Sequence, residues 1–140
     1  MRFRPIFALA SRVRENANRL ILSELEKAGL PGIAPSHGDI FVELFRNDGC
    51  SMGELADHIR RTKSTVTTLV KKLEAQGYVT RIKRKDDARG TEVYLTSRGR
   101  ELRPVLEAVS RRLQLQVERS LTEEEADQLE KLLQKMLENG

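Results

Sequence analysis

Apolar side chains recur every three or four residues along the first 28 positions. The stripe consists of Ile6, Ala10, Val13, Ala17, Leu20, Ile21 and Leu25. This spacing follows the period of an α-helix and predicts one helix over residues 5–28. Pro5 suits its first turn and Gly29 its C-terminal cap. The next segment, residues 29–35 (GLPGIAP), is rich in helix breakers and predicts a linker.

A short helix is predicted directly after this linker. Ser36 with Asp39 marks its start, and the turn sequence Asn47-Asp48-Gly49 marks its end. Its apolar face is formed by Ile40, Phe41, Leu44 and Phe45.

A second short helix, SMGELADHI, is predicted from a capping signal. Ser51 and Glu54 have the spacing of a capping box. Cys50 then falls at the position before the cap, where it is expected to pack against Leu55 as a hydrophobic staple. The fourth predicted helix covers about residues 63–76, with an apolar stripe of Val66, Leu69, Val70 and Leu73.

The period changes after Gly77, which suits a left-handed helix cap. The segment VTRIKRKDDARGTEVYLT predicts two short strands joined by a polar, charged turn. In the second strand Val93 and Leu95 alternate with Glu92 and Tyr94, as in a strand with one buried face.

Two amphipathic helices are predicted for the rest of the chain. Thr96 or Ser97 caps a long helix, and Pro104 should bend it or delay its start. Thr122 with Glu125 forms a capping box for the last helix. Its stripe is Leu129, Leu132, Leu133, Met136 and Leu137.

Charge is unevenly distributed along the chain. The net charge is +4, but residues 60–103 hold 13 Lys and Arg against five Asp and Glu, a balance of +8. The remaining 96 residues carry 12 basic and 16 acidic side chains. A positive segment inside an otherwise acidic chain suggests a site for a polyanion, although a solvated charged face fits the charge pattern equally well.

Composition narrows the class of protein. One cysteine excludes a disulfide framework within the chain and predicts a reducing, cytoplasmic location. Two histidines and one cysteine are too few for most zinc sites, and no motif for a nucleotide, a cofactor or a catalytic nucleophile is found. We therefore expect no cofactor, no metal, no enzymatic activity and no membrane span.

Helix, tight turn, helix and hairpin together predict a winged helix-turn-helix. When its apolar stripe faces inward, the helix over 63–76 turns Ser64, Thr67, Thr68, Lys71 and Lys72 outward. Small hydroxyl side chains let a helix lie deep in the major groove of DNA, and lysines reach phosphates. The turn of the hairpin carries Arg84, Lys85 and Arg89, which can reach the minor groove. Asp87 is expected to orient Arg89, with a simple turn-forming role as the alternative.

The chain resembles MarR-type winged-helix transcriptional regulators. The wing pattern D-x-R-x₃-V-x-L-T-x-x-G is present as Asp87, Arg89, Val93, Leu95, Thr96 and Gly99, and residues 54–81 match the family's helix-turn-helix. One departure is Arg60, which stands where many such turns carry Gly. The resemblance implies a mainly α fold with a small β-hairpin wing, in which residues 36–96 bind DNA and residues 5–28 and 97–139 form dimerisation helices.

The resemblance also implies a function and its residues. It implies a cytoplasmic homodimer, usually a repressor, that binds a pseudo-palindromic double-stranded operator and is released by a small-molecule ligand or an oxidant. The DNA-binding residues it implies are Lys63, Ser64, Thr65, Thr67, Thr68, Lys71 and the wing arginine Arg89. Two alternatives stay open: a winged-helix protein-interaction module without DNA binding, and a thiol-based redox sensor that uses Cys50.

Overall fold

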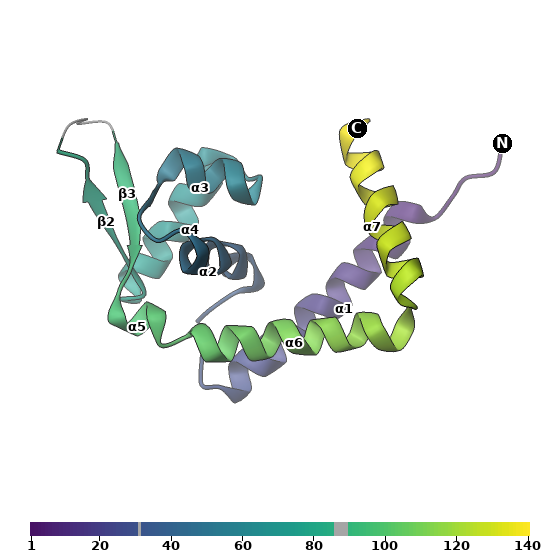
Figure 1. The fold of residues 1–140 in the computed structure, drawn as a ribbon, viewed down its shortest axis with the longest axis horizontal. Helices are drawn as coiled ribbons and strands as arrows, with labels where there is room; N and C mark the ends of the chain where they lie inside the picture. Colours follow the sequence, from purple (N-terminus) through teal and green to yellow (C-terminus); the bar gives the residue numbers. More distant parts are fainter. Residues whose placement is uncertain (31, 86–89) are drawn as a thin grey trace. The chain divides into compact units, whose positions relative to one another are not determined.

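The computed structural model describes residues 1–30, 32–85 and 90–140. Along the described chain the elements are α1 (Ile6–Lys27), α2 (Pro35–Arg46), β1 (Cys50–Ser51), α3 (Met52–Ile59), α4 (Lys63–Ala75), β2 (Val79–Lys83), β3 (Thr91–Leu95), α5 (Ser97–Arg100), α6 (Arg103–Ser120) and α7 (Glu123–Glu138) (Figure 1). The chain divides into two compact units, residues 1–106 and 107–140. The mainly helical fold class with a small β wing is confirmed.

The core of the first unit lies between α2, α3, α4 and the strands. Phe41 of α2 is fully buried, and the ring of Tyr78 meets it edge-on at 6.0 Å between ring centroids. The other fully buried large side chains are Leu25, Ile33, Ile40, Leu44, Cys50, Leu55, Val66, Val70, Leu73, Val79 and Val93. The apolar faces predicted for α2 and α4, together with Leu55 of α3, therefore supply this core.

The strands form one antiparallel sheet in the order β1-β3-β2. Val79 pairs with Leu95 and Lys83 with Thr91, so β2 and β3 make the predicted hairpin. β1 was not predicted; Cys50 pairs with Val93 at the other edge of β3. The Asp48 carboxylate accepts a hydrogen bond of 2.8 Å from the Leu95 N–H and ties the preceding turn to the same strand.

The predicted start of α2 is wrong by one residue. The helix begins at Pro35 with Ala34 at the N-cap, so Ser36 lies inside the first turn. Proline at this position needs no hydrogen-bonded N–H. His37 completes the cap, because its Nδ1 accepts the Ala34 N–H at 3.0 Å.

The predicted long helix after the hairpin is two helices. Thr96 caps the short α5 by accepting the Gly99 N–H at 3.2 Å. α6 begins at Arg103, so Pro104 occupies its second position, where proline is tolerated. Pro104 thus delays the start of the long helix, which was one of the two predicted outcomes.

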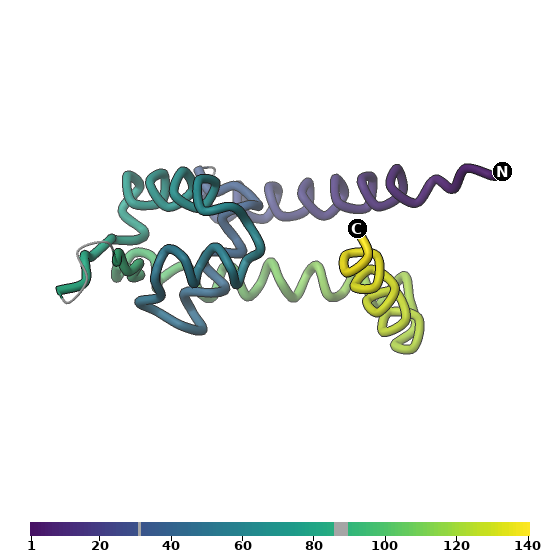
Figure 2. The backbone as a smooth tube through the Cα atoms, turned by 90° about the horizontal axis from the view of Figure 1, so that it is seen from above, coloured from purple at the N-terminus to yellow at the C-terminus, as the bar shows by residue number. Residues whose placement is uncertain are grey.

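α1 extends as one long helix away from the remaining helices of the first unit (Figure 2). Of its residues only Leu25 is buried, whereas Phe7 and Val13 are 77% and 67% exposed. In the described part of the chain, no helix has the length and apolar character needed to cross a membrane.

Candidate nucleic-acid interface

α3 and α4 form the predicted helix-turn-helix. Ser51 caps α3 by accepting the Glu54 N–H at 3.0 Å, and Thr62 caps α4 by accepting the Thr65 N–H at 3.2 Å. Between the helices, Arg60 adopts the left-handed conformation, with φ 55° and ψ 47°. This is the position at which many such turns carry glycine, and the structure shows why: the backbone must turn with positive φ.

The predicted recognition-helix residues lie on the outer face of α4. Val66, Val70 and Leu73 are buried, which confirms the predicted inward stripe. The opposite face consists of Lys63, Ser64, Thr65, Thr68 and Lys71, all exposed, and of Thr67, which is half-buried.

The hydroxyl groups on this face have different roles. Thr67 Oγ1 donates to the Lys63 carbonyl at 2.8 Å, and Thr68 Oγ1 donates to the Ser64 carbonyl at 3.1 Å. Because each proton is used within the helix, the oxygen lone pairs and the methyl groups remain for outside contacts. Thr65 instead accepts a hydrogen bond from the Thr62 hydroxyl at 2.8 Å and supports the cap.

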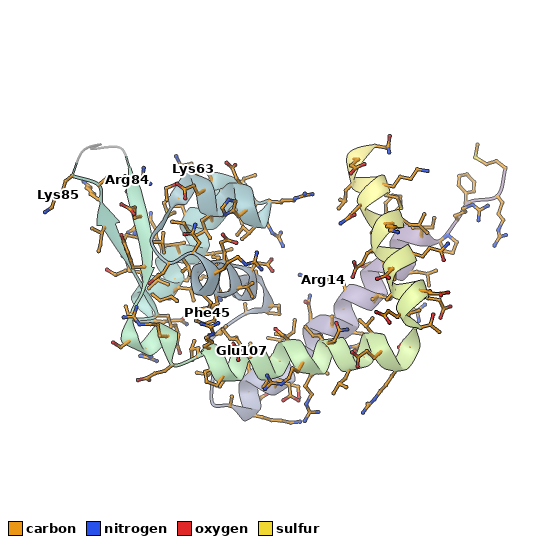
Figure 3. All side chains as sticks on the ribbon, viewed as in Figure 1. Arg14, Phe45, Lys63, Arg84, Lys85 and Glu107 are labelled. Atoms are coloured by element: carbon orange, nitrogen blue, oxygen red, sulfur yellow. The ribbon has the colours of Figure 1, made fainter. Side chains whose placement is uncertain are left out.

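The base of the wing lies at the same edge of the winged domain as the start of α4. Arg84 and Lys85 follow β2. Arg84 lines the same hollow as Lys63 of α4, and Figure 3 shows Lys85 further out, on the other side of Arg84 from Lys63. The Arg84 N–H donates to the Gly90 carbonyl at 2.9 Å and closes the described part of the hairpin. Lys85 is exposed. Asp87 and Arg89, the predicted tip residues, lie outside the described residues.

Two arginines near the wing are paired with carboxylates that the sequence did not reveal as partners. Arg84 Nη2 lies 3.6 Å from Glu54 Oε1, and its Nε lies 3.4 Å from Glu92 Oε1. Arg81 Nη2 lies 2.9 Å from Glu74 Oε1, and Arg81 Nε also donates to this carboxylate. These hydrogen bonds lower the pKa of the Glu74 carboxyl.

A hollow of about 450 Å³ lies between α3, the start of α4 and the base of the wing. Three of the side chains around it are basic: Lys63, Arg81 and Arg84. The remaining lining residues are Ser51, Met52, Gly53, Thr67, Gly90 and Thr91. A polar, basic hollow on this face suits an anionic group such as a backbone phosphate.

Cys50 is buried in the core, with 2% of its surface exposed. Burial raises the pKa of its thiol to about 11, and the nearby Glu43 and Glu54 carboxylates add to the shift. The thiol is therefore protonated at neutral pH, the less reactive form. Within residues 1–30, 32–85 and 90–140, no group of three or more His, Cys, Asp or Glu residues could hold a metal ion.

A helix-turn-helix followed by a β-hairpin defines a winged helix-turn-helix protein. The family model described as "MarR family" matches residues 33–91. The regulator SarZ of Staphylococcus haemolyticus is 36% identical over 101 residues, which are 72% of this chain and 67% of that protein. A transcriptional repressor of Mycobacterium bovis is 33% identical over 93 residues, which are 66% of this chain and 67% of that protein.

The solved structures agree with this class. The Staphylococcus aureus MepR–DNA complex superposes with a TM-score of 0.86 at 23% identity, over 99% of this chain and 100% of that chain. The chain belongs to the MarR family. Across the curated relatives, the matched segments span 33% to 67% of the relative's own length.

Proposed function

We propose that the protein is a transcriptional regulator that binds double-stranded DNA through α4 and the wing. The observation that carries the proposal is the outer face of α4, where Lys63, Thr68 and Lys71 are exposed. Lys63 also lines the hollow at the base of the wing together with Arg84. A helix with small side chains near its N-terminus fits the major groove, and flanking lysines neutralise phosphates. The MepR neighbour in complex with DNA supports the same use of this fold.

Within this proposal, residues 36–96 form the DNA-binding region. Ser64, Thr67 and Thr68 face the base edges, where hydroxyl lone pairs accept from cytosine or adenine amino groups and methyl groups meet thymine. Lys63, Lys71, Arg84 and Lys85 contact phosphates. Thr65 acts mainly through the cap of α4, and Asp87 and Arg89 extend the interface along the turn of the wing.

The proposal includes a homodimer built from residues 5–28 and 97–139. Its support is the apolar surface of the terminal helices. α7 has no buried residue, and Leu132 and Leu137 are 52% and 69% exposed. On α1, Ile6, Phe7 and Leu9 are also exposed. Two copies related by two-fold symmetry would cover such surfaces and present two recognition helices to a pseudo-palindromic operator.

Repression of transcription in the cytoplasm and release by a small-molecule effector complete the proposal. The Mycobacterium bovis relative, named as a repressor, supports the direction of regulation. The effector rests on family membership alone. The alternative of a redox sensor at Cys50 is disfavoured by the burial and the raised pKa of the thiol.

Selection of bound fragments from the source genome tests this function. The wild-type protein should enrich a small set of duplexes that share a near-palindromic sequence. Thr68→Ala, which removes a hydroxyl and a methyl group from the exposed face, should relax the enriched sequence without abolishing binding. A wild-type protein that enriches no sequence would favour the protein-interaction module.

A further inference from the structure

Arg84 is held between two carboxylates from different elements. Glu92 belongs to β3 and lies 3.4 Å from Arg84 Nε, whereas Glu54 belongs to the first turn of α3 and lies 3.6 Å from Arg84 Nη2. Arg84 also borders the basic hollow beside α4. The Arg84 guanidinium, which links the wing to α3, therefore faces the surface proposed to receive DNA.

The two carboxylates hold Arg84 unequally. Glu92 is itself fixed, because the Tyr94 hydroxyl donates to its Oε2 at 3.2 Å, and its side chain is only 27% exposed. The Glu54 side chain is 48% exposed, and its contact with Arg84 is the longer one. Exposed ion pairs of this length contribute little to stability, so the Glu54 contact is readily exchanged.

The backbone leaves room for this arrangement at Gly90. A Cβ atom at residue 90 would lie 2.7 Å from Arg84 Cδ and 3.2 Å from Arg84 Cγ. The aliphatic part of Arg84 therefore crosses the base of the wing directly over Gly90. This position places the guanidinium at the border of the hollow.

We propose that Glu54 is an internal competitor for a DNA phosphate. In the free protein Glu54 and Glu92 together hold Arg84. When DNA binds, a backbone phosphate enters the hollow next to Lys63 and replaces Glu54, while Glu92 keeps the guanidinium oriented. Glu54 thereby reduces affinity for DNA and ties the wing to α3 in the unbound state. The inference rests on the proposed DNA-binding function.

The test compares the duplex affinity of three single variants and one double variant with that of the wild type. Glu54→Gln keeps the size of the side chain, and glutamine also suits the third position of a helix. It should tighten binding about twofold to fivefold, the range that corresponds to an exposed ion pair. The matched control is Asp57→Asn, which removes one negative charge one turn further along α3 and should have a smaller effect. The probe is a fluorescein-labelled duplex carrying the selected sequence, measured by anisotropy at fixed salt.

The double variant decides whether Glu54 acts through Arg84. Arg84→Met should weaken binding to the duplex. Adding Glu54→Gln to Arg84→Met should not change the affinity further, because the guanidinium for which Glu54 and the phosphate compete is absent. Equal gains from Glu54→Gln and Asp57→Asn would overturn the inference, as would a full Glu54→Gln gain in the Arg84→Met background. A wild-type protein that binds no duplex would reject the proposed function and this inference with it, whereas normal wild-type binding with an unchanged Glu54→Gln affinity would reject this inference alone.

Discussion

Arg60 shows how one residue can meet a backbone requirement at a cost. It ends α3 with φ 55° and ψ 47°, and its N–H donates to the Asp57 carbonyl. A side chain with a Cβ disfavours this left-handed conformation, and glycine does not. The sequence showed that Arg60 departs from the usual glycine, and the structure shows that the backbone geometry is kept.

Replacing Arg60 with glycine should therefore stabilise the protein. We expect the free energy of unfolding to rise by about 1 kcal/mol, with part of the gain offset by the greater freedom of glycine in the unfolded chain. Urea unfolding at fixed protein concentration measures it. Arg60→Ala removes the same charge but keeps a Cβ, so it should give no gain; an equal gain from both variants would show that charge, not backbone conformation, is responsible.

The N-terminal cap of α2 depends on pH through the protonation of His37. It is 3% exposed, and burial, followed by the positive charge of Lys72, lowers the pKa of its imidazole below 6.5. Its Nδ1 accepts the Ala34 N–H, which only the neutral ring can do. The unfolded chain therefore binds the proton more readily than the folded one, and stability present above the unfolded pKa is lost as the pH falls toward the folded pKa.

We expect the free energy of unfolding to fall when the pH is lowered from about 7 to about 5, by an amount that depends on His37. His37→Gln keeps an acceptor at this position but does not titrate there, so its stability should change less over the same interval. Urea unfolding at several pH values gives both slopes. Identical slopes for the two proteins would place the pH dependence elsewhere.

At the scale of elements, local signals in the sequence were sufficient for most of the helices. Caps at Ser51 and Thr122 and the periodic stripes of α1, α4 and α7 require only neighbouring residues. β1 escaped prediction because a strand of two residues has no measurable period. The pairs of Arg84 with Glu54 and Glu92 also escaped, since they join elements whose proximity depends on the tertiary fold. The recognition-helix positions were identified as exposed, and their contacts with DNA remain predictions.

Gly99 of α5 packs against the backbone of Tyr78, which leaves no space for a side chain at this position. A Cβ atom at this position would collide with the Tyr78 carbonyl and lie 3.2 Å from Leu95 Cδ2. Gly38 of α2 is the matched case, because a Cβ there would meet nothing within 4 Å. The two glycines therefore separate the effect of close packing from that of helix propensity.

Gly99→Ala should lower the free energy of unfolding by about 1–3 kcal/mol or more through this overpacking. Gly38→Ala should raise it by about 0.5–1 kcal/mol, because alanine favours the helix. Thermal or urea unfolding measures both. A neutral Gly99→Ala would contradict the close approach of α5 to the Tyr78 backbone.

At the scale of the whole molecule, the terminal helices carry the proposed dimer interface. Leu129, Leu132, Leu133 and Met136 are each at least 40% exposed on α7 in a single chain. Amphipathic helices of this length are marginal in water by themselves, so their apolar faces require a partner.

Leu133→Glu should therefore convert a dimer into a monomer or an aggregating protein and weaken binding to a palindromic duplex. Gln134→Glu adds the same charge one residue further along α7, off the apolar stripe, and should leave the dimer intact. Sedimentation velocity distinguishes these states. A Leu133→Glu protein that sediments as a dimer and binds DNA normally would remove α7 from the interface.

The positive segment over residues 60–103 suggests DNA as the partner of the molecule, but some of its basic side chains already form ion pairs within the protein. Arg81 and Arg84 are paired with Glu74 and Glu92, which are two of the five acidic residues already counted in the balance of +8, so the positive field comes mainly from the other lysines and arginines of the segment. Lys63 and Lys71 are exposed on α4 and should account for much of the electrostatic binding.

The salt dependence of duplex binding tests the proposed DNA interface most directly. The logarithm of the wild-type association constant should fall linearly with the logarithm of salt concentration, and Lys63→Gln and Lys71→Gln should each make this slope shallower by about 0.9. Lys131→Gln on α7 removes the same charge and should leave the slope unchanged. A wild-type affinity that does not vary with salt, or equal slopes for all four proteins, would contradict binding of DNA through α4.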